Sequence, residues 1–198
     1  MHKSRDLGVE DGFSADGLTV RWDHDIAIAA LRYFDPAGAF AMEAGGVLGG
    51  SLPAPLRAHR RLLGTPGVSA EVGANGTPKA GSELVLAWRS PTETLLLTTD
   101  AAILATVGAF AADRSDGCLV EHTGGILCLA IAGSRAPDLL LRLGSTDAIP
   151  APGEARTSRL AELSVMSLCI RPEEIMLLVE RVHARHLFAW IRETVADF

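Results

Sequence analysis

The stretch that decides the fold reads VEHTGGILCLAIAGSRAPDLLLRLG over residues 120–144. Two short apolar runs, 118–123 and 126–132, flank a pair of glycines and have the length and composition of β-strands. We expect them to pair with each other around Gly124-Gly125. A helix is predicted directly afterwards, over 135–143, with Ser134 as its N-cap.

The same order of elements extends outward in both directions. Toward the C-terminus the patterns predict strands over 155–160, 163–170 and 175–180, and a final helix over 182–195. Toward the N-terminus they predict strands over 18–23, 26–34, 83–89 and 93–98, helices over 37–48 and 101–112, and a loop over 64–82 with a short strand at 68–72. Thr99 or Asp100 is the expected N-cap of the helix over 101–112.

Two similar halves follow from this order. Each half, 18–113 and 117–198, reads strand, strand, helix, strands, helix, and residues 1–17 read as a loose arm. Antiparallel strands interleaved with helices predict an α+β fold in which helices cover one face of the sheets. We therefore expect residues 18–198 to form a single unit.

Composition restricts the classes of function. The chain has 198 residues, 48% of them apolar, and a formal net charge of −6. An acidic protein is poorly suited to nucleic acid, where phosphate contacts dominate affinity, and the basic residues 57–61 read as a solvated loop. Cys118, Cys128 and Cys169 lie in apolar runs and are expected to be buried, reduced thiols. With no signal peptide and no membrane-spanning run expected, the chain reads as cytoplasmic.

For each motif that could have a catalytic or ligand-binding role, a purely structural role is favoured. Cys118 and His122 could share a strand face as a nucleophile pair, but a buried cysteine and a strand-end histidine are favoured. The glycines of 45–50 lack the context of a phosphate loop and are expected to end a helix. His183 and His186 lie one turn apart, yet no third metal ligand is evident. We expect neither catalytic residues nor a metal site.

The tripeptide Glu121-His122-Thr123 is the most site-like feature. A carboxylate at a strand end could accept hydrogen bonds from a pterin or an amine. The alternative is a turn in which these polar side chains satisfy local backbone groups. The residues alone leave both interpretations open.

A set of weak motifs in a fixed order resembles one known family. After Glu121 and Thr123 the chain carries Gly133, Arg135, Asp138, Asp147, Pro152-Gly153, Thr157, Arg181 and Trp190. This order resembles the gamma subunit of heterotetrameric sarcosine oxidases, over about Leu18 to Trp190. The resemblance implies a fold like the folate-binding domain of glycine-cleavage aminomethyltransferases. The chain departs from the family pattern at Ile126, where the family often has arginine.

The resemblance also implies a function. The chain would be a non-catalytic, gamma-like subunit of a complex that oxidatively demethylates an N-methyl amine, converting sarcosine to glycine and a one-carbon unit. Its partners would be larger flavoprotein subunits that hold the flavins and NAD, with no cofactor expected on this chain. The alternative is a stand-alone tetrahydrofolate-binding or aminomethyltransferase-like protein, with Glu121, Thr123, Arg156 and Arg181 as its ligand-binding residues.

Overall fold

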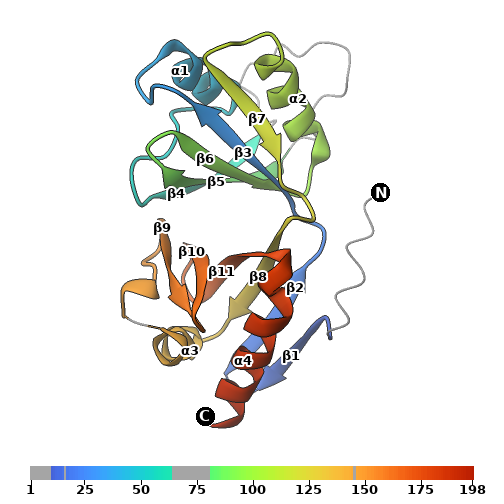
Figure 1. Cartoon of the computed structure of the whole chain (residues 1–198), viewed down its shortest axis with the longest axis vertical. Helices are drawn as coiled ribbons and strands as arrows, with labels where there is room; N and C mark the ends of the chain where they lie inside the picture. The colour runs from blue at the N-terminus through green and yellow to red at the C-terminus, as the bar shows by residue number, and fades with distance from the viewer. Residues whose placement is uncertain (1–9, 16, 64–80, 145) are drawn as a thin grey trace. The chain divides into compact units, whose positions relative to one another are not determined.

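A computed structural model describes residues 10–15, 17–63, 81–144 and 146–198. These residues form two antiparallel sheets and four α-helices, so the predicted α+β class is confirmed (Figure 1). The chain divides into two compact units. The terminal unit comprises Met1–His24 and Gly124–Phe198, and the central unit is Asp25–Thr123. The strand expected at 68–72 lies outside the described residues.

The terminal unit contains a six-stranded sheet in the order β1-β2-β8-β11-β10-β9. Its elements are β1 (Gly12–Ala15), β2 (Leu18–Asp23), β8 (Ile126–Ala132), α3 (Ala136–Leu143), η1 (Thr146–Ala148), β9 (Glu154–Leu160), β10 (Leu163–Arg171), β11 (Glu174–Glu180), η2 (Arg181–His183) and α4 (Ala184–Ala196). Helices α3 and α4 pack on the sheet, and one core joins Leu139 and Ile191 to Leu129 and Leu177. The ring of Phe188 contacts the rings of Phe13 and Trp22, with centroid distances of 5.7 and 5.8 Å.

The central unit contains a five-stranded sheet in the order β4-β5-β6-β3-β7. Its elements are β3 (Ala27–Tyr33), α1 (Ala39–Val47), β4 (Ala58–Leu63), β5 (Ser82–Ser90), β6 (Glu93–Thr98), α2 (Ala101–Ala111) and β7 (Gly117–Glu121). Phe40 of α1 and Ile103 and Val107 of α2 pack against Leu31 and Leu96 of the sheet. The predicted hairpin of β5 and β6 is confirmed, including its turn after Ser90.

The expected pairing of β7 with β8 is wrong. β7 pairs with β3 in one sheet, whereas β8 pairs with β2 and β11 in the other. Gly124 and Gly125 therefore lie where the chain leaves the central unit and enters the terminal unit, and they do not form a hairpin turn. Because β2 joins the terminal sheet, the units differ from the expected halves 18–113 and 117–198.

Three smaller expectations also differ from the structure. Residues 12–15, expected within a loose arm, form β1 and pair with β2. The basic stretch 57–61, expected as a loop, enters β4 at Ala58, where His59 and Arg61 alternate with Arg60 along an outer strand of the sheet. Ser134 does not cap α3, whose N-cap position is Arg135 and has no side-chain hydrogen bond. A polar residue before a helical pattern is only a weak marker of the first turn.

Candidate functional site

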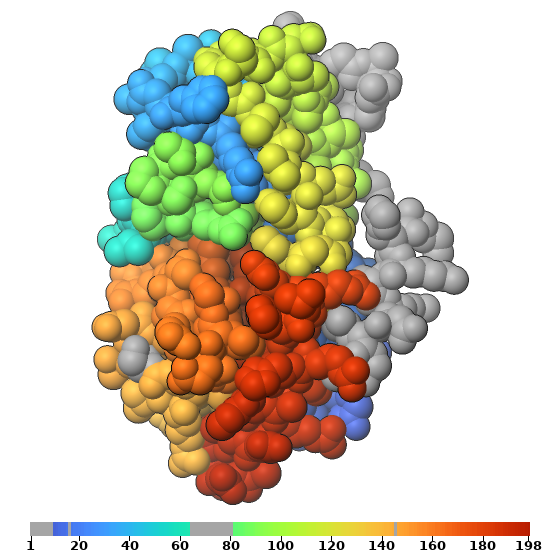
Figure 2. Space-filling view, in the orientation of Figure 1, coloured from blue at the N-terminus to red at the C-terminus, as the bar shows by residue number. Residues whose placement is uncertain are grey.

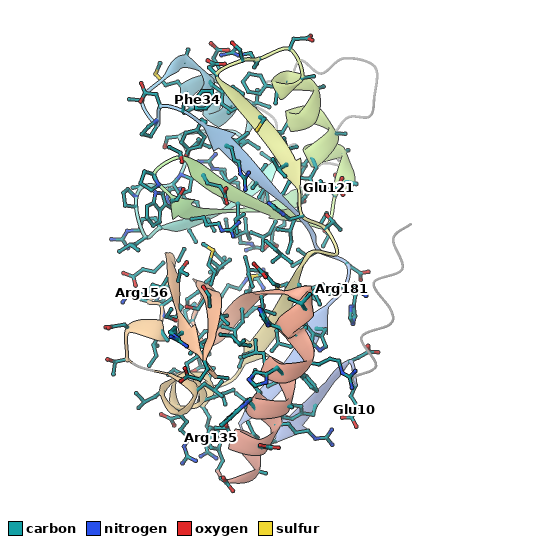
Figure 3. All side chains as sticks on the ribbon, in the orientation of Figure 1. Glu10, Phe34, Glu121, Arg135, Arg156 and Arg181 are labelled. Carbon is teal, nitrogen blue, oxygen red and sulfur yellow. The ribbon has the colours of Figure 1, made fainter. Side chains whose placement is uncertain are left out.

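Thr123, two residues after the end of β7, makes hydrogen bonds to the backbone of β3. Its hydroxyl accepts a hydrogen bond from the Ile28 N–H at 3.1 Å and donates to the Ile28 carbonyl at 3.3 Å. Both hydrogen bonds of the side chain are thus directed at the backbone of β3, 95 residues away in the sequence, and not at local backbone groups of a turn. Glu121 is exposed at the C-terminal end of β7 (Figure 3).

His122 lies between them and is a partly buried imidazole. Its backbone N–H donates to the Ile28 carbonyl at 2.8 Å, which continues the ladder between β7 and β3. Its Nε2 is buried and has no hydrogen-bond partner among the described residues. Burial, followed by the positive charge of Arg89, lowers the pKa of His122. The imidazole is therefore neutral near pH 7.

Cys118 and His122 do not form a nucleophile pair. Residues four apart on a strand are separated by roughly 13 Å along the chain, beyond hydrogen-bond reach. Cys118 is exposed, so its expected burial is wrong, because β7 is the last strand of its sheet among the described residues. Cys128 and Cys169 are buried as expected, and burial raises the pKa of both thiols.

Arg156 and Arg181 lie in the terminal unit and are separated from each other by β10. Arg156 on β9 binds Glu154 on the same strand, with N–O distances of 2.9 and 2.8 Å. Arg181 follows β11, and its backbone N–H donates to the Gly125 carbonyl at 2.8 Å. The two guanidinium-bearing residues therefore do not form one binding set, and Arg156 and Thr123 already have protein partners. The ligand-binding role expected for Glu121, Thr123, Arg156 and Arg181 stays a prediction.

Two surface hollows flank β7 in the central unit, and sequence reasoning did not anticipate either. The Phe34 hollow, of about 620 Å³, is lined by residues that include Arg32, Phe34, Glu93, Arg114, Gly117 and Cys118. The α2 groove, of about 610 Å³, is lined by residues that include Ala29, Ala101, Ala105, Gly108, Leu119 and Glu121. Gly117, Cys118 and Arg114 line both. The sequence signal for the groove was the run of small residues in α2.

The charges around the Phe34 hollow are paired. The Glu93 carboxylate accepts from the Arg32 Nε and from Arg89, each at 2.7 Å. Phe34 beside this pair is 80% exposed, which makes it one of the two most exposed large apolar side chains of the described residues (Figure 3). The hollow therefore has an exposed apolar residue at its rim and a carboxylate that is already ion-paired.

Arg114 organises the N-terminal end of β7. It donates to Asp116 at 3.1 and 3.2 Å and to Glu43 at 2.6 Å, and it lies over the rings of Phe40 and Phe110. The hydrogen bonds from Arg114 lower the pKa of Asp116. This network fixes the turn that leads into β7.

The described residues contain no group of three or more His, Cys, Asp and Glu side chains placed to hold a metal ion. In the same part of the chain, no helix has the length and hydropathy needed to span a membrane.

Comparison with known proteins gives matches in structure. No family model and no curated protein sequence matches the chain. The structure matches a chain of the heterotetrameric sarcosine oxidase from Corynebacterium sp. U-96, solved with pyrrole 2-carboxylate. The TM-score is 0.73 at 18% identity, and the match covers 95% of this chain and 89% of that chain.

A second match is the glycine cleavage system aminomethyltransferase T from Bartonella henselae, with a TM-score of 0.65 at 13% identity. It covers 88% of this chain and 45% of that chain, so this chain corresponds to slightly less than half of the aminomethyltransferase. The chain has the folate-binding-like fold. The fold expected from the sequence resemblance is thus confirmed, and at these identities the likeness concerns the fold.

Proposed function

We propose that this chain is an accessory, gamma-like subunit of a complex of the sarcosine oxidase type, which oxidatively demethylates an N-methyl amine. The observation that carries the proposal is the extent of the structural match. A chain of a heterotetrameric sarcosine oxidase is matched over 95% of this chain and 89% of its own length. The aminomethyltransferase extends well beyond this chain, since only 45% of it is covered.

The contacts of the expected ligand-binding residues favour an assembly role over a folate-binding one. The Thr123 hydroxyl is hydrogen bonded to Ile28, and Arg156 is ion-paired with Glu154. A folate ligand would have to compete with these protein partners. In this proposal the flavins and NAD belong to larger partner subunits, and this chain contributes to assembly and to the shape of the complex.

Deletion of the gene for this chain in its host tests the proposal. We expect host cells that lack the chain to lose sarcosine-dependent hydrogen peroxide production, and expression of the wild-type chain to restore it. A Glu121→Ala chain should restore it equally well, since Glu121 has no ligand role in this account. Unchanged peroxide production in cells without the chain would overturn the proposal.

Titration with tetrahydrofolate distinguishes the alternative of a stand-alone folate-binding protein. A ligand that binds only the native state raises the melting temperature by mass action. We expect no change in melting temperature for the isolated chain. A rise that disappears in Arg181→Ala and Arg156→Ala chains would favour the folate-binding alternative instead.

A further inference from the structure

The start of α4 carries two arginines whose side chains have no partner among the described residues. Arg181 lies in η2, directly before α4 (Figure 3), and Arg185 lies in the first turn of the helix. Within the described part of the chain, neither guanidinium makes a hydrogen bond, an ion pair or a ring contact, and the same is true only of Arg21. All other described arginines have such a contact.

The nearest carboxylates along the chain do not compensate these charges. Glu180 precedes Arg181 but forms no ion pair with it in the structure described, and Glu193 follows Arg185 by two turns of helix, about 12 Å along the axis. Residues 181–192 contain no aspartate, glutamate or lysine. In a chain with a formal net charge of −6, this segment therefore presents two uncompensated cations.

Exposed apolar side chains lie in the same segment. Val182 is 80% exposed and Trp190 is 48% exposed. Among the described residues of the terminal unit, Leu141 is the only other exposed large apolar side chain. Protein interfaces are enriched in tryptophan and arginine and depleted in lysine, glutamate and aspartate at their centre. The composition of residues 181–192 is therefore that of an interface.

The inner side of α4 holds these residues in place. Leu187, Phe188 and Ile191 are buried in the core of the terminal unit. The space-filling view shows the red segment that contains α4 at the surface of this unit (Figure 2). A surface that is already ordered loses less conformational entropy on binding, which favours association.

We infer that the exposed side of residues 181–190, the α4 face, binds an acidic surface of a larger partner subunit. Arg181 and Arg185 donate to carboxylates of that subunit, and Val182 and Trp190 pack against apolar atoms beside them. Charge identifies the occupant, because a guanidinium without an acceptor matches a carboxylate in bidentate geometry. A symmetric contact with the same face of a second copy would bring like charges together, which is unfavourable. The inference rests on the proposed function, from which the partner is taken.

Charge reversal tests the α4 face. In host cells that lack the wild-type chain, a tagged chain with both Arg181→Glu and Arg185→Glu is compared with tagged wild type and with Arg21→Glu. Arg21 is the matched control, because it is exposed on β2 and lies on the sheet face opposite that of Val20, which packs in the core with α4. We expect the double variant to retain about tenfold less flavoprotein, since attraction becomes repulsion, and Arg21→Glu to retain the wild-type amount.

The double variant is expected to fold. Arg181 and Arg185 have no side-chain contact to lose within the described residues, and glutamate is favourable in the first turn of a helix. Circular dichroism and thermal unfolding verify this.

The apolar part of the face has its own matched pair of variants. Trp190 and Leu141 have nearly the same exposed fraction, 48% and 47%, but lie on different helices. We expect Trp190→Ala to retain about fivefold less flavoprotein, as for the loss of an interface anchor, and Leu141→Ala to retain the wild-type amount.

A zero-length cross-link tests whether the partner surface is acidic. A carbodiimide joins a lysine amine to a carboxylate that is in contact with it. The chain has lysine only at positions 3 and 79, so an amine introduced by Arg185→Lys is readily assigned by mass spectrometry. We expect a cross-link from position 185 to an aspartate or glutamate of the flavoprotein, and none from position 21 in the control Arg21→Lys.

The outcomes separate this inference from the proposed function. Tagged wild type that retains no flavoprotein overturns both. Wild type and the double variant that retain equal amounts overturn the inference alone, as does an equal loss in Arg21→Glu or the absence of a cross-link from position 185. A melting temperature that rises with tetrahydrofolate in wild type and not in the double variant also overturns it, because the arginines then bind a small anion. Loss in the double variant together with the cross-link supports it.

Discussion

Gly45 and Gly46 are adjacent in α1, but the space around their Cα atoms differs. A Cβ on Gly45 would lie 2.7 Å from the backbone carbonyl oxygen of Gly50 and 3.3 Å from the Cα of Ser51. A Cβ on Gly46 would meet nothing within 4 Å. Gly45 therefore allows the chain after α1 to fold back closely against the helix, whereas Gly46 has no such role.

We predict opposite effects of alanine at these two positions. Gly45→Ala should lower the free energy of unfolding by about 1–3 kcal/mol, because backbone must move to admit the methyl group. Gly46→Ala should raise it by about 0.5–1 kcal/mol through helix propensity. Urea unfolding of the two chains measures both changes, and equal effects at the two sites would contradict the close approach.

The lowered pKa of His122 predicts a pH dependence of stability. An imidazole whose folded pKa lies below its unfolded value, near 6.5, binds its proton more tightly in the unfolded chain. Its contribution to stability is therefore complete above that value and is lost as the pH falls toward the lower folded pKa. We expect the melting temperature of wild type to fall between about pH 7 and pH 5 more steeply than that of His122→Asn.

His59 contributes in the same direction, since burial, followed by the charges of Arg61 and Arg57, lowers its pKa. His122→Asn should thus flatten the profile only in part, and the double replacement with His59→Asn should flatten it further. Indistinguishable slopes for wild type and His122→Asn would show that the buried Nε2 has no such penalty.

At the scale of elements, two expected helix caps have different outcomes. The Asp100 side chain accepts from the Ala102 N–H at 3.0 Å at the start of α2, as predicted. It also accepts from the Ser82 hydroxyl at 2.6 Å, which ties the helix to the start of β5. Ser134 is exposed before α3 and caps nothing.

Alanine replacement distinguishes these two caps. Asp100→Ala should lower the free energy of unfolding by about 1–2 kcal/mol, as for the loss of a helix cap. Ser134→Ala should change it by less than about 0.5 kcal/mol, as at most surface sites. Thermal or urea unfolding measures both, and a larger loss for Ser134→Ala would contradict the observed cap positions.

Local patterns predicted elements better than pairings. The alternation of residues 18–23 and the apolar runs at 93–98 and 126–132 identified β2, β6 and β8 at their observed bounds. The partners of β7 and β8 could not be predicted, because the sequence of an apolar strand does not specify which strands pair with it. β4 was not predicted, because His59, Arg60 and Arg61 interrupt the alternation of apolar and polar residues that identifies a strand.

The candidate site was predicted even less fully than the fold. Glu121-His122-Thr123 was recognised as a strand end, but the hydrogen bonds of Thr123 to Ile28 join residues 95 apart in the sequence. The Phe34 hollow combines residues of β3, β6 and β7, and the α2 groove combines residues of β3, α2 and β7, which tertiary packing brings together. Apart from the small residues of α2, the sequence contains no signal for these hollows.

At the scale of the whole molecule, the fold matches a chain of a heterotetrameric sarcosine oxidase and part of a glycine cleavage system aminomethyltransferase, and the mutual coverage is far greater for the sarcosine oxidase chain. A folate-binding-like fold can host many roles, so function must come from the partners and sites of this chain. In the function proposed above, the oxidative chemistry belongs to larger subunits and this chain has an assembly role.

The most direct test is affinity purification of the tagged chain from its native host, with mass spectrometry and a visible absorption spectrum of the eluate. We predict a yellow eluate with flavin absorption and a larger flavoprotein at a fixed ratio to this chain. A colourless eluate that contains this chain alone, as a monomer or as a dimer, would contradict the assignment to an amine-oxidising complex.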